Sequence, residues 1–159
     1  MKWEQHTEFV TYTIFGAGLG ERAFDPAEFE LFPEDWLASM AGVRMTSALI
    51  RIEPLSDDET IAARLRDWFV PESLAVSHVL DNAAVVASDF RIDPGGHLRI
   101  AMFVSPDTGR RRIGRVVQRL CEIETYKTMS MLGFSRAREM QSRMGEIDGN
   151  LTALMADMT

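Results

Sequence analysis

Apolar and polar residues alternate in several segments of this chain, which is the pattern of half-buried β-strands. The clearest alternation covers residues 84–93 and 97–104, and the Pro-Gly-Gly sequence between them is typical of a hairpin turn. Three further segments, 3–15, 43–52 and 74–80, are rich in β-branched and aromatic residues. We therefore predict a mixed or antiparallel sheet of about five strands, packed by helices.

Helical periodicity dominates the second half of the chain. Apolar residues recur every three or four positions from about residue 108 to 132, and again after residue 135. Gly133 lies between these segments, and because glycine commonly ends a helix we predict a C-terminal helical pair. Two shorter helices are expected earlier, one after Pro33 and one after the capping box at residues 56–59. The predicted fold class is α+β.

The last helical segment carries an apolar stripe with the heptad spacing of a coiled coil. Its members are separated alternately by three and four residues: Ala137, Met140, Met144, Ile147, Leu151, Leu154 and Met158. We assign residues 1–132 to an α+β globular domain and residues 133–159 to this heptad-patterned helix. Three interpretations stay open, because such a stripe can pack on the preceding helix, pack on another chain, or belong to a frayed or truncated end. The second would make the protein a homo-oligomer.

The helix predicted over residues 114–126 has one carboxylate on its apolar face. On a wheel of ~100° per residue, Glu124 falls in the arc of Leu120 and Ile123. A buried carboxylate is unfavourable unless something pairs with it. Glu124 is therefore either a structural acid, held by Lys127 or an arginine, or a catalytic acid.

The first predicted strand places Glu4, His6 and Glu8 at alternate positions, and so on one face. Two carboxylates beside an imidazole can ligate a divalent metal if a further ligand joins them, but a solvated strand face has the same pattern. His6 and Glu124 are the candidate catalytic residues, and a divalent metal is the one candidate cofactor. On the 84–93 strand, Asp89 and Arg91 share a side and are expected to form structural ion pairs.

Composition and charge limit the classes of function that this chain can have. The net charge of -7 argues against a nucleic-acid partner, because phosphate binding requires a basic surface. Cys121 is the single cysteine, which excludes an internal disulfide, and its mid-helix position indicates a packed residue. No signal peptide and no apolar stretch of the ~20 residues that span a bilayer is visible in the sequence. The P-loop, nucleophile-elbow and HExxH motifs are absent as well.

Three groups of residues together resemble the bacterial family of unknown function DUF3422, described as predicted membrane-anchored proteins. They are residues 3–13, residues 33–37, and the pair 88–91 with 114–126. The motif positions in these segments are Trp3, Glu4, His6, Thr7, Glu8, Asp89, Arg91, Arg115, Gln118, Arg119, Glu122, Glu124 and Tyr126. The resemblance implies a central soluble portion of a longer protein, held at the cytoplasmic face of the bacterial inner membrane by segments absent from this chain. It implies no activity, cofactor or substrate.

We therefore expect an interaction, oligomerisation or sensing module that self-associates through residues 137–158 or binds a protein partner. The alternative is a metal-assisted or acid/base hydrolytic enzyme. That alternative requires the Glu4-His6-Glu8 face and Glu124 to converge on one pocket.

Overall fold

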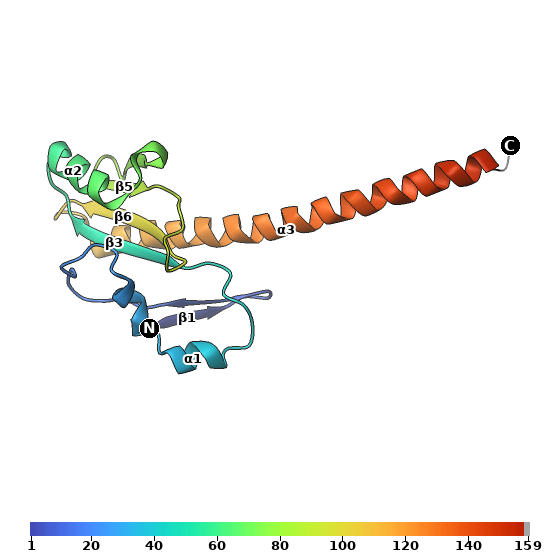
Figure 1. The fold of residues 1–159 in the computed structure, drawn as a ribbon. Helices are drawn as coiled ribbons and strands as arrows, with labels where there is room; N and C mark the ends of the chain where they lie inside the picture. Colours follow the sequence, from blue (N-terminus) through green and yellow to red (C-terminus); the bar gives the residue numbers. More distant parts are fainter. Residues whose placement is uncertain (158–159) are drawn as a thin grey trace. The chain divides into compact units, whose positions relative to one another are not determined.

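The computed structural model describes residues 1–157 and confirms the α+β class. The chain divides into two compact units, residues 1–117 and 118–159. All strands and the shorter helices belong to the first unit, whose parts are labelled in Figure 1. Met158, the last member of the predicted stripe, lies outside the described residues.

The first unit begins with a two-stranded antiparallel sheet, in which β1 (Lys2–Gln5) pairs with β2 (Val10–Thr13). The prediction of one strand over residues 3–15 is therefore wrong. The chain reverses between the strands, where the His6 amide donates to the Phe9 carbonyl at 2.9 Å. A short 3-10 helix η1 (Pro26–Leu31) and helix α1 (Glu34–Ser39) follow the hairpin.

The second sheet has four strands in the order β3-β6-β5-β4. They are β3 (Ala48–Pro54), β4 (Ala75–Val79), β5 (Ala84–Ser88) and β6 (Leu98–Val104). The sheet is mixed, because β3 and β6 run parallel and the other neighbours antiparallel.

Strand β5 ends five residues before the predicted limit at residue 93. Phe90 has a φ of 54°, a left-handed backbone that a strand cannot contain. The predicted turn after it does form, with the Gly96 amide donating to the Asp93 carbonyl at 2.9 Å. Gly96 adopts a φ of 84°, which explains glycine at this position.

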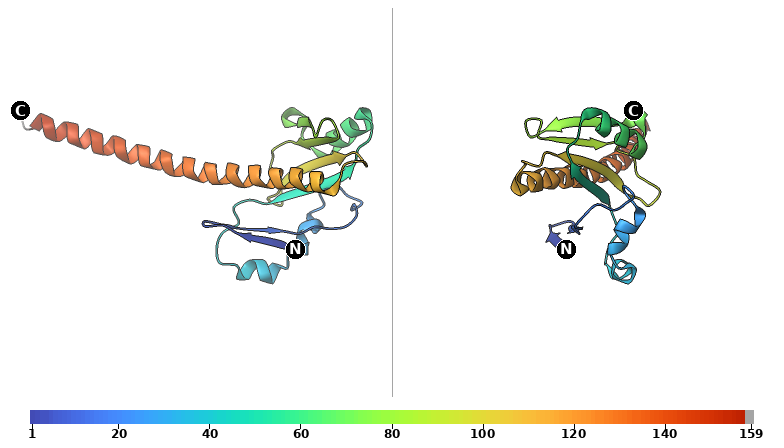
Figure 2. Two further views of the ribbon diagram at one scale, coloured as in Figure 1. Left: turned by 180° about the vertical axis from the view of Figure 1, so that it is seen from behind. Right: turned by 90° about the vertical axis from the view of Figure 1, so that its left-hand side faces the viewer.

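Helix α2 (Asp58–Trp68) covers one face of the four-stranded sheet, as Figures 1 and 2 show. Asp57 caps it, with its carboxylate accepting from the Thr60 amide at 2.8 Å, so the cap lies one residue after the start of the predicted box. A one-turn 3-10 helix, η2 (Pro71–Ser73), then leads to β4. The core under α2 is apolar: Leu49, Ile61, Leu65, Phe69, Val85, Ala87, Ala101 and Phe103.

Helix α3 (Arg110–Asp157) has 48 residues and is continuous. Within the first unit, its opening turns place Ile113, Val116 and Val117 against Met102 and its neighbours on the other face of the sheet. The helix passes through Gly133 without a break, so one helix replaces the predicted pair. An isolated glycine costs a helix only about 1 kcal/mol relative to alanine, which good helix formers on both sides offset. The described residues of the second unit all belong to α3.

Candidate functional site

The structure separates the three polar residues predicted to share a strand face. Glu4 lies on β1, where its carboxylate pairs with the Lys2 ammonium at 2.9 Å. His6 and Glu8 lie in the turn that follows, and the His6 ring stacks on Phe9 with centroids 4.3 Å apart. The alternation behind the proposed metal ligands therefore stops at Gln5.

Among the side chains that the structure describes, no three from His, Cys, Asp or Glu are grouped so that they could hold a metal ion. A metal role for Glu4, His6 and Glu8 stays a prediction, as does acid/base catalysis by His6. His6 belongs to the first unit and Glu124 to the second.

Glu124 is buried, with 6% of its surface exposed, which confirms the helical-wheel prediction. One carboxylate oxygen lies 2.5 Å from the Lys127 ammonium, and the other accepts a hydrogen bond from the Thr128 hydroxyl at 3.3 Å. Both partners lie three or four residues later on the same helix, which is the spacing at which side chains on one helix face contact each other. The neighbouring Ile123, in contrast, is exposed. The geometry is that of a structural acid, and a catalytic role for Glu124 stays a prediction.

Asp89, the other acid singled out in the sequence, is 1% exposed and fully engaged. Its carboxylate pairs with the Arg99 guanidinium at 3.1 Å and accepts from the amides of Val70 and Arg91 at 3.1 and 3.2 Å. Arg91 instead donates to the Ser73 hydroxyl at 2.7 Å. The expected ion pair of Asp89 is confirmed, and it joins the end of β5 to β6 and to the chain leaving α2.

Glu53 is a third buried acid, and the sequence patterns did not single it out. Glu53 is flanked by Arg51, whose Nε lies 2.6 Å from the carboxylate, and by Arg64 of α2. The Arg51 guanidinium also lies over the Trp68 ring, 5.6 Å from its centroid. The signal that could have found the pair is Arg51-x-Glu53, two charges on the same face of an apolar strand. Because these charges satisfy one another, the group stabilises the packing of α2 on β3.

The apolar stripe of α3 is exposed throughout its described part, from residue 137 to residue 154. Its five large members, Met140, Met144, Ile147, Leu151 and Leu154, expose between 54 and 66% of their surfaces. In heptad notation, Ala137, Met144 and Leu151 occupy position a, and Met140, Ile147 and Leu154 occupy position d. Soluble proteins seldom leave such a contiguous apolar stripe in water without a function for it. The stripe is thus an exposed apolar surface of the second unit.

No helix within residues 1–157 is both long enough and apolar enough to span a membrane. No curated protein and no solved structure matches the chain. The sequence model of one family, described as a protein of unknown function (DUF3422), matches residues 1–159, which is the entire chain. The chain therefore belongs to the DUF3422 family of proteins of unknown function.

Proposed function

We propose that this protein is a self-associating interaction module, in which α3 of two copies forms a parallel two-stranded coiled coil over residues 137–157. The observation that carries the proposal is the exposed heptad stripe of α3. Pairing two such stripes removes both from water, at roughly 25 cal/mol for each Å² of apolar surface buried. Self-association follows because one stripe is complementary to its own copy.

The continuity of α3 favours another chain as the partner of the stripe. A return of residues 133–157 onto the preceding helix requires a turn, and the helix has none between Arg110 and Asp157. The spacing of three and four residues is also that of two helices supercoiled around each other, rather than of a helix lying on a broad core. An identical helix is therefore the occupant that best fits the stripe.

Charges beside the stripe favour the parallel orientation. Arg143 occupies heptad position g and Asp148 the following position e. In a parallel pair, position g of one helix lies beside position e of the next heptad on the other. Arg143 then lies beside Asp148 of the partner subunit, and two-fold symmetry forms this opposite-charge contact twice.

The glycines of this segment are compatible with the coiled coil. Gly145 and Gly149 fall at positions b and f, which face away from the partner helix. They lower helix propensity but leave no gap in the seam. Met140 and Met144 fill its first half with flexible side chains that adapt to imperfect packing.

Light scattering coupled to size exclusion tests the proposal on the full chain. We expect a mass of two chains for the native protein and of one chain for the double variant Ile147→Lys/Leu151→Lys. The control Ser142→Lys/Thr152→Lys adds the same charges at exposed positions outside the seam and should remain dimeric. A native protein that is monomeric at 100 µM, or a seam variant that remains dimeric, would count decisively against the coiled coil.

We also infer that, in a longer membrane-anchored protein, the coiled coil serves as a stalk at the cytoplasmic face of the bacterial inner membrane. The support is the family resemblance together with the length of α3. Protease treatment of spheroplasts expressing such a protein tests this: the globular unit should be cleaved only after lysis. Cleavage in intact spheroplasts would place it on the opposite side.

A further inference from the structure

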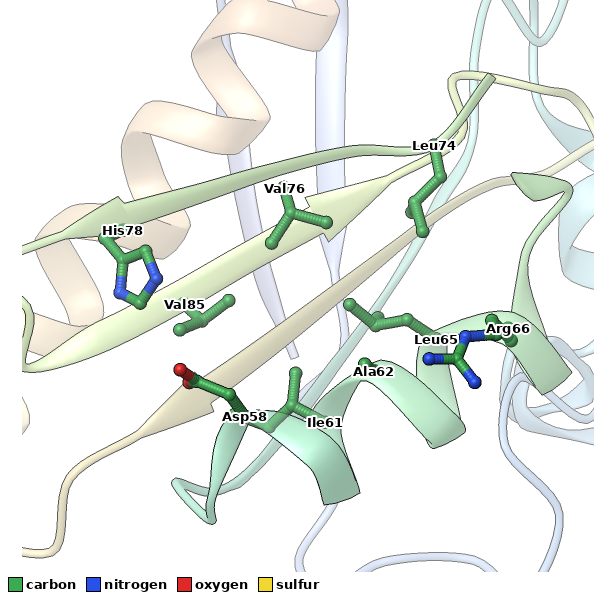
Figure 3. A pocket seen from close by; sticks show the side chains of 9 residues that line it. All are labelled: Asp58, Ile61, Ala62, Leu65, Arg66, Leu74, Val76, His78 and Val85. Atoms are coloured by element: carbon green, nitrogen blue, oxygen red, sulfur yellow. The ribbon is translucent and has the colours of Figure 1, made fainter. Parts of the chain in front are cut away.

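An apolar groove lies between helix α2 and strand β4 of the first unit (Figure 3). Ile61, Ala62 and Leu65 line it from α2, and Leu74 and Val76 line it from the other side. Its volume of about 230 Å³ is below the ~300 Å³ at which pockets for whole small molecules begin. The space suits a few side chains of a larger partner.

Strand β4 forms the open edge of the four-stranded sheet beside this groove. It pairs with β5 on one side only, and four of its five residues are exposed. An edge strand presents unpaired backbone donors and acceptors to any extended chain that approaches it. Strand β4 contains no proline, lysine, arginine or carboxylate that would protect this edge.

The hydrogen-bond pattern identifies which residues face outward. The Ala83 carbonyl accepts from the Ser105 amide, next to β6, so alternate residues 85 and 87 also face β6. Residues 84, 86 and 88 consequently face β4, where their partners are residues 79, 77 and 75. Val76 and His78 are left with backbone groups directed away from β5. Their side chains line the same groove.

The ends of the groove carry opposite charges. Asp58 lies near His78 at one end, and Arg66 lies toward Leu74 at the other (Figure 3). Among the side chains that the structure describes, those of Asp58, His78 and Arg66 take part in no ion pair or side-chain hydrogen bond. Their polar groups are thus available to a ligand that lies along the groove.

We propose that the groove binds an extended peptide segment of a partner protein, which adds to the edge of β4 as an antiparallel strand. The peptide amino end lies beside Asp58 and carries a basic residue, and its carboxyl end lies beside Arg66 and carries an acidic one. Alternate apolar side chains enter the groove opposite Val76 and His78. Backbone pairing supplies affinity in this mode of recognition, and the pockets supply specificity. The site is independent of self-association through α3.

Two peptides of identical composition test the proposal. The first is acetyl-Lys-Thr-Val-Thr-Val-Thr-Glu-amide, which places its two valines opposite Val76 and His78 and its charges as proposed. The second exchanges the lysine and the glutamate. Titrating each into the isotopically labelled full chain, we expect the first peptide to shift the amide resonances of Val76 and His78 most strongly. We expect it to bind about tenfold more tightly than the second, because two attractive charge contacts become repulsive.

Matched variants locate the site. Val76→Glu puts a charge into the groove at a half-exposed position and should abolish binding. Ser77→Glu adds the same charge to the opposite face of β4 and should leave binding intact. Exchanging the end charges, with Asp58→Lys and Arg66→Glu together, should reverse the preference between the two peptides.

Three results would overturn the inference. They are unperturbed Val76 and His78 amides at millimolar peptide, equal affinity for the two peptides, and binding that survives Val76→Glu. Concentration-dependent shifts of the β4 amides without peptide would also overturn it, because they would identify a second copy of the chain as the occupant of the edge.

Discussion

At the scale of single residues, the buried acids of this protein are held by specific partners. Glu53 and Asp89 are paired with arginines inside the first unit, and Glu124 is paired with Lys127 in the second. Removing one member of such a pair is costly, because it leaves the remaining polar group buried without its full set of interactions. We therefore expect substitutions of these residues to act first on the stability of the fold, rather than on a chemical reaction.

Glu124→Gln tests whether burial makes this acid important for stability. We expect the free energy of unfolding to fall by about 1–3 kcal/mol, because the charge-assisted contact with Lys127 is lost in a buried position. Glu139→Gln is the matched control, since Glu139 pairs with Arg136 at the same spacing on α3 but is exposed. It should change the unfolding free energy by no more than about 0.5 kcal/mol in urea denaturation. Equal effects of the two substitutions would contradict a structural role for the buried pair.

His97 should make stability depend on pH. Burial lowers the pKa of its imidazole below 6.5, with the Asp93 carboxylate opposing this shift and the Arg44 guanidinium adding to it. The unfolded chain therefore binds this proton more readily than the folded one. The stability that the folded protein gains from neutral His97 is fully present above about pH 6.5. It is lost as the pH falls from there toward the lower pKa of His97 in the folded state.

We expect the native protein to lose more stability than His97→Asn between pH 7.5 and 5.5, measured by urea denaturation at each pH. The asparagine amide can keep the contact that the His97 ring makes with the Ser47 hydroxyl, at 2.7 Å, without titrating. Parallel pH profiles for the two proteins would show that His97 protonates equally in both states.

At the scale of elements, α3 shows how a local signal can be overridden. Gly133 favours a helix end, but ending the helix there would also require the left-handed backbone that closes a helix, and α3 continues instead. The same helix carries the heptad stripe. Because α3 contains no turn, no part of this helix folds back to cover the stripe. Orientation of the proposed coiled coil is then decided by the flanking charges.

Exchange of those charges tests the orientation. Asp148→Lys should weaken dimerisation by about tenfold, because each Arg143 then faces a lysine of the partner subunit. Adding Arg143→Glu to the same chain should recover most of the loss. Analytical ultracentrifugation measures both dissociation constants, and circular dichroism controls for changes in helix content. A double variant as weak as the single one would argue for an antiparallel pair or another register.

At the scale of the whole molecule, the chain has two units that depend on different interactions. The first unit has its own core, formed by a sheet with helices on both faces. The second consists of one helix whose large apolar residues are exposed, so packing within the unit contributes little to its stability. Its helix should therefore be stabilised by association.

Thermal unfolding followed at 222 nm should depend on protein concentration. Because association stabilises the folded state by mass action, we expect the melting midpoint of the helix to rise by at least about 2 °C when the concentration is raised a hundredfold. Ile147→Lys/Leu151→Lys should abolish this dependence and leave the unfolding of the globular unit unchanged. A midpoint of the native protein that is independent of concentration would mean that α3 is stable alone.

The sequence by itself determined what depends on local periodicity and composition. Strand β6, the turn at residues 93–96, helix α2, the burial of Glu124 and the heptad stripe all follow from the spacing of apolar residues and from residues with special backbone preferences. These signals act within a few residues of one another, so they can be read without knowledge of the fold.

Only the tertiary structure decided what depends on contacts between distant segments. The chain reverses at His6–Phe9 and ends β1 at Gln5, although alternation alone favoured a continuous strand. The partner of Asp89 is Arg99 on another strand, and the groove exists because α2 and β4 meet across the sheet. Sequence spacing does not predict such contacts between distant segments, because strand order and helix placement are set by the packing of the whole core.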